Sequence, residues 1–432
     1  MSTALIITLI LMIGLLIVGV PIAISLTSSG LVGLYLAYGD GALTAVTQTM
    51  FNTVNSFLLL AVPLFILMGV ILGRSEIGSK IYNIFDTFLR HIPGGIGIAT
   101  ILTCAVLAAM IGTSVAVAAM VGSFALTNLV KYGYKLSLSI GIIAAGGALG
   151  ILIPPSVPMI LYSAISMESA GKLFISGIIP GVLTIILFSS YIVIVSIRDQ
   201  GSKKAPKASW EDRLKSLKEG FWALIIPFAI MFPLYLGIAT PTEVAVIGVT
   251  WSLIVGLFIY KTIKFKDLFS IFKEGMDSSV MVLFVICGAM IFGNTVNQLG
   301  LPELILSTTS SITHPVWFVC VTVLVMLVLG MFIEGASIML IALPLFLPAL
   351  IALQVPLIWY AVIMVMAIEI GLLTPPVGLN IYAVDGVAKG LKLDSSLSDA
   401  IKGTFPFMIM YLIALLIVLF VPKLALWLPS VM

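Results

Sequence analysis

Two short proline-containing stretches, Gly150–Ser156 (GILIPPS) and Gly371–Val377 (GLLTPPV), decide how this sequence folds. A double proline removes two backbone hydrogen-bond donors and pushes the preceding residue out of the α region, so neither stretch continues a helix. Both lie inside long apolar sequence. A helix broken at bilayer depth exposes peptide groups that lipid cannot satisfy, and it persists only where protein or a polar ligand meets it. We therefore interpret both breaks as parts of an ion and substrate site. The helix-breaking residues are Pro154, Pro155, Pro375 and Pro376.

The composition indicates an all-α polytopic membrane protein. Of the 432 residues, 61% are hydrophobic and only 9% are charged, and the mean hydropathy is +1.26. Soluble globular proteins of average composition do not approach these values. A spanning helix needs roughly 20 apolar residues, and the apolar runs suffice for about ten to twelve spans. Whether residues 1–38 cross the membrane once or twice stays open at this point.

The second half of the sequence repeats the first. Each half has a mixed polar and apolar stretch that suits a helix along the membrane interface (residues 77–90 and 302–311), followed by a long apolar run and then a double-proline break. Small and polar residues interrupt the two runs, at 112–114 (GTS) and at 333–337 (IEGAS). The paired landmarks are about 222 residues apart. The first run fits either two spans with a tight turn or a hairpin that enters and leaves on one face.

This repeat divides the chain into moving and fixed parts. We predict two transport regions, 93–170 and 315–390, each a re-entrant hairpin followed by a broken helix. The remaining segments are 1–92 (scaffold spans and the first interfacial arm), 171–314 (scaffold spans, a cytoplasmic loop at 198–219 and the second arm) and 391–432 (a C-terminal scaffold span).

The basic residues orient the chain in the membrane. If the first hairpin opens toward the cytoplasm and the second toward the outside, every lysine and arginine except Lys172 and Lys423 lies on the cytoplasmic side. The two repeats are then inverted relative to each other. Inverted repeats with discontinuous helices are the architecture of secondary transporters that bind substrate between the repeats.

Several motifs resemble a known family. The run ATPTEVAVIG (239–248), the GILIPPS break, the run LLTPPVGLNIY (372–382) and the two small-residue tips are similar to the large, DctM-type membrane subunit of tripartite ATP-independent periplasmic (TRAP) transporters. The resemblance covers essentially the whole chain. It implies a sodium-driven elevator-type transporter of the bacterial inner membrane. Its implied partners are a periplasmic substrate-binding protein, a small four-helix (DctQ-type) membrane subunit on a separate chain, and the lipid bilayer, with no nucleic acid.

The breaks and tips supply the expected ion ligands. Sodium prefers oxygen ligands, and a helix that stops at a proline pair exposes carbonyl groups. We predict at least two sodium ions, one per repeat. The first site uses Thr113, Ser114, Gly150, Ile151 and Ile153, and the second uses Gly335, Ser337, Gly371, Leu372 and Thr374.

The substrate anion is expected between the two ion sites. Amides at the amino termini of the half-helices favour negative charge there. Ser156 and Asn380, just beyond the breaks, are the candidate substrate contacts, although Asn380 could equally brace one helix on another. Among the acids, Glu334 could touch sodium or bond the hairpin backbone, whereas Glu243 and Glu369 are expected to cap or tie helices.

These residues predict sodium-coupled uptake of an organic acid anion, of the C4-dicarboxylate, sialic acid or keto-sugar acid class. An enzyme is not expected, because no H-E-x-x-H, G-x-S-x-G or His/Cys cluster is present. The G-x-x-x-x-G-K-[ST] motif of an ATP-driven pump is also absent. The alternative is a one-component sodium/carboxylate symporter that works without a binding protein.

Overall fold

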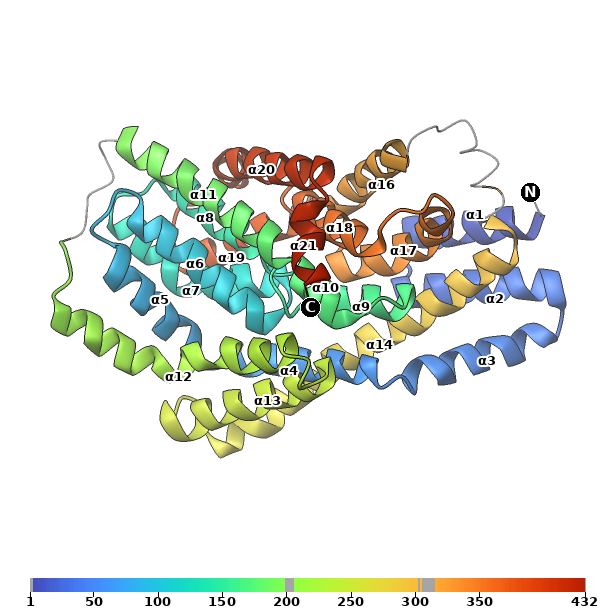
Figure 1. The fold of residues 1–432 in the computed structure, drawn as a ribbon, viewed down its shortest axis with the longest axis horizontal. Helices are drawn as coiled ribbons and strands as arrows, with labels where there is room; N and C mark the ends of the chain where they lie inside the picture. Colours follow the sequence, from blue (N-terminus) through green and yellow to red (C-terminus); the bar gives the residue numbers. More distant parts are fainter. Residues whose placement is uncertain (1–2, 199–205, 302–303, 305–314, 432) are drawn as a thin grey trace.

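The computed structural model describes residues 3–198, 206–301, 304 and 315–431, and every regular element in these ranges is a helix (Figure 1). This confirms the predicted all-α class. Within the described residues, seven helices are long and apolar enough to cross a membrane, or up to eight if the bent pair of α3 (Gly41–Val54) and α4 (Ala61–Gly73, after a 3-10 turn at Leu58–Leu60) is one span. That number is below the expected ten to twelve because several hairpin arms and half-helices are shorter than a full span.

Both repeats contain the predicted hairpin and broken helix. In Figure 1 the first hairpin lies left of the centre and the second lies right of it. The Pro154–Pro155 and Pro375–Pro376 bonds are both cis. The first repeat consists of the arm α5 (Ile77–Leu89), the hairpin α6 (Gly95–Ile111) and α7 (Ser114–Lys131), and the broken helix α8 (Leu136–Gly147) and α9 (Val157–Ser166). The second has the hairpin α16 (Pro315–Gly330) and α17 (Gly335–Ala352), and the broken helix α18 (Leu357–Leu372) and α19 (Leu379–Gly390).

The remaining helices surround these two units. Residues 1–38, whose number of crossings the sequence left open, form two helices that pack on each other, α1 (Thr3–Ile17) and α2 (Ile22–Tyr38). The longest helix, α14 (Leu268–Gln298), packs on α2, and the Thr295 hydroxyl donates a hydrogen bond to the Gly30 carbonyl at 3.1 Å. The others are α10 (Ala170–Ser176), α11 (Ile178–Arg198), α12 (Trp210–Tyr235), α13 (Pro241–Ile254), a π-helical turn at Val255–Ile259, a 3-10 turn at Phe265–Asp267, α20 (Leu397–Phe420) and α21 (Lys423–Ser430).

The polar loop at 198–219 is shorter than predicted. Helix α12 begins at Trp210, because Ser209 and Asp212 form a capping box: the Asp212 amide donates to the Ser209 hydroxyl at 3.0 Å, and the Ser209 amide donates to the Asp212 carboxylate at 3.1 Å. The charged residues after Trp210 therefore extend a helix rather than a loop. The second interfacial arm, predicted at 302–311, lies outside the described residues apart from Leu304.

The two repeats are interlocked rather than side by side. The half-helix α9 of the first repeat packs on α17 of the second hairpin, and the half-helix α19 of the second repeat packs on α7 of the first hairpin. The Tyr162 hydroxyl on α9 also donates to the Leu357 carbonyl at the start of α18, at 2.8 Å. Each hairpin is thus held partly by the other repeat.

The last long helix, α20, packs against the two repeats. Helix α20 packs along α8, the Tyr411 hydroxyl donates to the Ala148 carbonyl in the first break at 3.2 Å, and the Trp359 indole donates to the Val418 carbonyl at 2.9 Å. The division into a moving block and a fixed scaffold, with residues 391–432 in the scaffold, stays a prediction.

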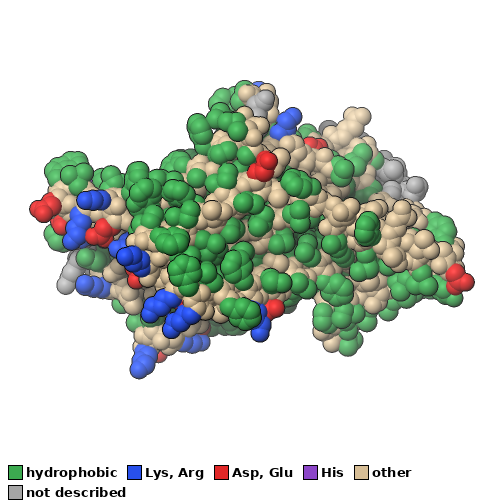
Figure 2. All heavy atoms as spheres, turned by 90° about the horizontal axis from the view of Figure 1, so that it is seen from below, with side chains coloured by type: hydrophobic (Ala, Val, Ile, Leu, Met, Phe, Trp, Pro, Cys, Tyr) green, Lys and Arg blue, Asp and Glu red, His purple; other side chains and the backbone are tan. Residues whose placement is uncertain are grey.

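Basic side chains gather at one end of the molecule. On the face shown in Figure 2 most lysine and arginine side chains lie at the left end, and the surface to their right is mainly apolar. Where clustered basic residues flank apolar spans they mark the cytoplasmic side of a membrane protein.

Candidate functional site

The first hairpin tip lies directly against the first break. Gly150 packs so closely on the tip that a Cβ atom there would be 2.6 Å from the Ser114 Cα and 2.8 Å from the Ser114 amide nitrogen. Gly112, at the tip, has a φ of +70°, and a Cβ on it would lie 3.4 Å from the Pro155 carbonyl oxygen. The left-handed conformation and the close approach both favour glycine. Residues of the first predicted sodium site are thus brought together.

The second hairpin meets its break through a different residue. A Cβ on Gly371 would be 2.6 Å from the Cα of Gly330, which ends α16, before the tip begins. The predicted tip residue Gly335 lies between the two breaks: a Cβ there would be 3.4 Å from Ile151 Cδ1 and 3.6 Å from Leu372 Cδ1. The second tip therefore contacts both repeats.

The two hydroxyl groups predicted for the second site donate hydrogen bonds to other protein groups. The Ser337 hydroxyl donates to Glu334 Oε2 at 3.3 Å, and the Thr374 hydroxyl donates to the Ile370 carbonyl at 2.6 Å. Ser337 also lines a separate cavity of about 410 Å³ against α1, α2 and α14. In the first repeat, Ile153 faces an apolar cavity between α12 and the first hairpin.

Glu334 stabilises the second tip. Its carboxylate accepts hydrogen bonds from the Ala336 amide at 3.2 Å and from the Ser337 amide at 3.3 Å, so it caps the amino terminus of α17. Of the two roles left open, the bond to hairpin backbone is present. Glu243 likewise caps α13 as expected, through a capping box in which its carboxylate accepts from the Thr240 amide at 2.7 Å.

Three polar side chains at the breaks are buried and have no hydrogen-bond partner among the described residues. Ser156, Glu369 and Asn380 are all 0% exposed, and none of their side-chain oxygen or nitrogen atoms is hydrogen-bonded. Buried polar groups normally have a partner, and each exception needs an explanation. The expectation that Glu369 caps or ties helices stays a prediction.

Glu369 points from the second repeat toward the first ion site. Its carboxyl faces the Ser114 side chain and the Ile151 backbone, although no hydrogen bond closes to either. The carboxyl of Glu369 therefore brings an acidic oxygen donor of the second repeat to the hydroxyl of Ser114, and oxygen donors of this kind are those that a hard cation prefers.

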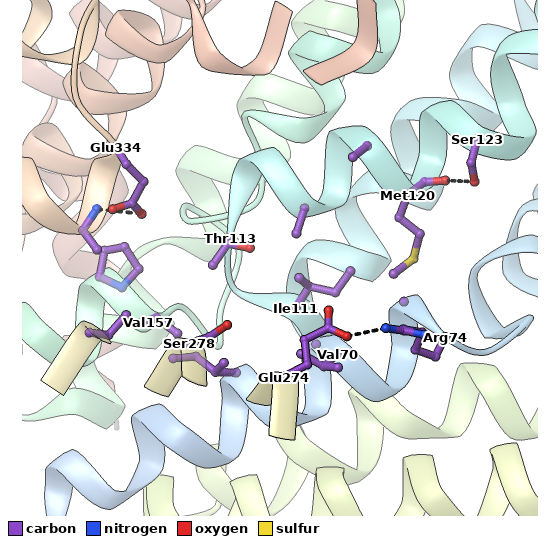
Figure 3. A pocket seen from close by; sticks show the side chains of 18 residues that line it. Val70, Arg74, Ile111, Thr113, Met120, Ser123, Val157, Glu274, Ser278 and Glu334 are labelled. Carbon is purple, nitrogen blue, oxygen red and sulfur yellow. Dashed lines mark hydrogen bonds and ion pairs between the residues drawn. The ribbon is translucent and has the colours of Figure 1, made fainter. Parts of the chain in front are cut away.

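A cavity of about 590 Å³ joins the two tips to the end of α4 (Figure 3). Thr113 of the first tip and Glu334 of the second line it, together with Val157 just after the first break. Ser156 is adjacent to this wall in sequence, whereas Asn380 does not line the cavity. The cavity therefore connects the tips but not all of the predicted substrate contacts.

An ion pair lies at the other end of the same cavity. Arg74 Nη2 and Glu274 Oε2 are 2.6 Å apart, between the end of α4 and the start of α14 (Figure 3). Sequence reasoning missed this pair, because the two residues are 200 positions apart and nothing in the sequence shows that they meet. Only the position of Arg74, directly after a span on the predicted cytoplasmic side, gave a signal.

Comparison with known proteins identifies the family. Residues 9–424 match the family described as tripartite ATP-independent periplasmic transporter, DctM component. The chain belongs to this family. The C4-dicarboxylate TRAP transporter large permease protein DctM of Vibrio cholerae is 34% identical over 98% of this chain and 97% of the relative. Family membership implies a small permease subunit and a periplasmic binding protein as partners.

Other TRAP relatives carry different substrates in their names. The isethionate TRAP transporter permease protein DctMQ of Oleidesulfovibrio alaskensis is 33% identical over 94% of this chain and 63% of the relative. The sialic acid TRAP transporter large permease protein SiaM of Vibrio cholerae is 30% identical over 96% of each chain. These relatives are named as transporter permease components, so this DctM-family chain is a membrane transport component and not an enzyme.

A solved structure shares the fold. The YdaH transporter of Alcanivorax borkumensis superposes with a TM-score of 0.61 over 90% of this chain and 89% of that chain, at 14% sequence identity. At this identity the likeness concerns the fold alone.

Proposed function

We propose that this DctM-family chain carries an organic acid anion into the cell together with at least two sodium ions, by an elevator movement of its two hairpins and broken helices. The observation that carries this proposal is the set of unpartnered buried groups, Ser156, Glu369 and Asn380, at two helix breaks that meet the hairpin tips. Groups of this kind are costly inside a membrane protein unless an ion or substrate uses them.

The first repeat offers the better-supported ion site. Ser114 of α7, the break at Gly150 and Ile151, and the Glu369 carboxyl of α18 lie close together. A bound sodium would offset the charge of Glu369 there. In the second repeat, Gly335 lies close to Leu372, and the Thr374 and Ser337 hydroxyls donate to protein acceptors while their oxygen lone pairs stay available to a cation.

The membrane potential would drive uptake only if net positive charge moves inward. Each elementary charge moved contributes about 2.3 kcal/mol per 100 mV. Two sodium ions with a monoanion leave one positive charge, whereas a dianion with two ions leaves none. A dicarboxylate substrate therefore requires a third sodium ion for electrogenic uptake.

The proposed assembly has three proteins in the bacterial inner membrane and the periplasm. A periplasmic binding protein delivers the acid, and a small four-helix subunit on a separate chain braces the large one. The substrate class is a C4-dicarboxylate, sialic acid or keto-sugar acid. The relatives named for C4-dicarboxylates and sialic acid make succinate and N-acetylneuraminate the first acids to test.

Reconstituted uptake tests this function. Liposomes containing the large and small subunits are supplied with a candidate binding protein and with labelled succinate, N-acetylneuraminate or 2-keto-3-deoxygluconate, with and without a sodium gradient. We expect uptake only when sodium and the binding protein are both present. Vigorous uptake by this chain alone would support the one-component symporter instead, and uptake that is indifferent to sodium would refute the coupling.

A further inference from the structure

The cavity that joins the two hairpin tips has one positively charged group among its described lining residues, the Arg74 guanidinium. Two carboxylates line the same cavity. Glu334 is held at the amino terminus of α17 by backbone amides, and Glu274 is paired with Arg74. An anion in this cavity therefore has a single cation to approach, and that cation is already bound to a carboxylate.

The Arg74–Glu274 pair is exposed enough to exchange. The Arg74 side chain is 55% exposed and the Glu274 side chain is 47% exposed. Ion pairs with this exposure contribute about 0–1 kcal/mol, because water competes for both groups. A fully buried pair would not open without a large penalty. Replacing the Glu274 carboxylate by another carboxylate at Arg74 thus costs little.

The guanidinium geometry suits this exchange. Arginine has five N–H donors in a planar fork that matches a carboxylate, and the bond to Glu274 Oε2 engages Nη2. The donors that remain can begin to bind a second carboxylate before Glu274 leaves. Arg74 directly follows α4, and the orientation predicted from the basic residues places this end of the cavity at the cytoplasmic side.

We propose that Arg74 receives the carboxylate of the transported acid on its way to the cytoplasm, and that Glu274 competes for the same guanidinium and so promotes release. This inference rests on the proposed function. In it, Glu274 is an internal substitute for the substrate: it occupies Arg74 when no acid is present and displaces the acid after transport. Arg74 alone would retain the acid, and Glu274 alone would repel it.

Inhibition of uptake by acid trapped inside liposomes measures this site. The complex of large and small subunits is reconstituted and supplied from outside with binding protein. The probe is whichever of succinate, N-acetylneuraminate and 2-keto-3-deoxygluconate the unmodified complex carries. Internal acid at increasing concentration then slows uptake of the labelled acid, and the half-inhibitory concentration reports affinity from the cytoplasmic side.

The two substitutions should have opposite effects. Arg74→Gln removes the charge-assisted bond, and we expect the half-inhibitory concentration to rise about tenfold. Glu274→Gln removes the competitor, and we expect the concentration to fall about threefold with slower turnover. Arg74→Lys keeps the charge but loses the fork, so its value should lie between those of the unmodified protein and Arg74→Gln.

A second exposed ion pair in the chain provides the matched control. Lys80 Nζ and Glu219 Oε2 are 3.1 Å apart between α5 and α12, and neither residue lines the cavity. Lys80→Gln and Glu219→Gln should leave the half-inhibitory concentration unchanged.

The results separate a release site from a purely structural ion pair. A structural pair predicts that Arg74→Gln and Glu274→Gln lower thermal stability together and shift internal inhibition in the same direction or not at all; either result overturns the inference. If Arg74→Gln does not fold, Glu274→Gln and Arg74→Lys still test the inference. They should shift the half-inhibitory concentration in opposite directions, and any other result refutes the inference. Absence of sodium-dependent uptake by the unmodified complex would overturn the proposed function itself.

Discussion

The contact between Gly371 and Gly330 sets a sharp prediction for the substitution Gly371→Ala. The added Cβ would lie 2.6 Å from the Gly330 Cα, 2.9 Å from the Leu327 carbonyl oxygen and 3.1 Å from the Gly330 carbonyl carbon. Carbon atoms pack at about 3.5–4.0 Å, so α16 and α18 would have to separate by about 1 Å. All three atoms belong to backbone and cannot rotate away. Overpacking of this kind costs about 1–3 kcal/mol.

Gly386→Ala is the matched control for this substitution. Gly386 also lies in a helix, α19, and a Cβ on it would meet nothing within 4 Å. Alanine is favoured over glycine by about 1 kcal/mol in a helix interior, as at Gly386, and by less at Gly371, which is one residue from the end of α18. The difference between the two variants is therefore mainly the overpacking term, about 1–3 kcal/mol or a factor of about 5 to 150 in the folded-to-unfolded ratio.

Thermal unfolding of the purified chain and sodium-dependent uptake by the complex measure the outcome. We expect Gly371→Ala to unfold at a lower temperature than Gly386→Ala and to transport poorly, because the second hairpin is displaced from its break. Equal unfolding temperatures and equal uptake for the two variants would show that this glycine contact does not hold the hairpin in place.

Three further substitutions test other contacts. Glu369→Gln replaces a buried carboxyl with an uncharged amide of the same shape, so we expect an unchanged or higher unfolding temperature but a half-saturating sodium concentration raised about tenfold; a lower unfolding temperature with unchanged sodium dependence would contradict this. Tyr411→Phe leaves the Ala148 carbonyl without its donor and should cost about 1 kcal/mol, measured by chemical denaturation, and an unchanged midpoint would count against that bond. Thr240→Ala removes the capping hydroxyl of α13 and should also cost about 1 kcal/mol with uptake retained, whereas lost uptake would indicate a direct role for this turn.

The sequence predicts local features of this fold well. Proline pairs break helices wherever they occur, so Pro154 and Pro375 locate both interruptions without any tertiary information. Glu243 follows Thr240 at the spacing of a capping box, and the structure contains that box. The small residues at 112–114 likewise mark a tip, because a left-handed Gly112 ends one helix and lets the next begin.

Contacts between distant segments could not be predicted. Glu369 was expected to cap or tie helices, but nothing in the sequence indicated that the interlocking of the repeats turns it toward Ser114 and Ile151 in the other half of the chain. Gly330 was not singled out, since nothing in its own neighbourhood shows that a second backbone approaches it. The capping box at Ser209 was overlooked, because the density of charge around it favoured a loop.

The exchange of half-helices between the repeats also bears on how such a chain is assembled. If the polypeptide were severed between α11 and α12, the amino-terminal piece would retain its own tip and break but lose α19, which covers α7. The carboxy-terminal piece would likewise lose α9, which covers α17. Neither fragment contains all the helices that its hairpin packs against, so the two are expected to function only when co-expressed. Any single-repeat ancestor would likewise have had to work as an antiparallel pair.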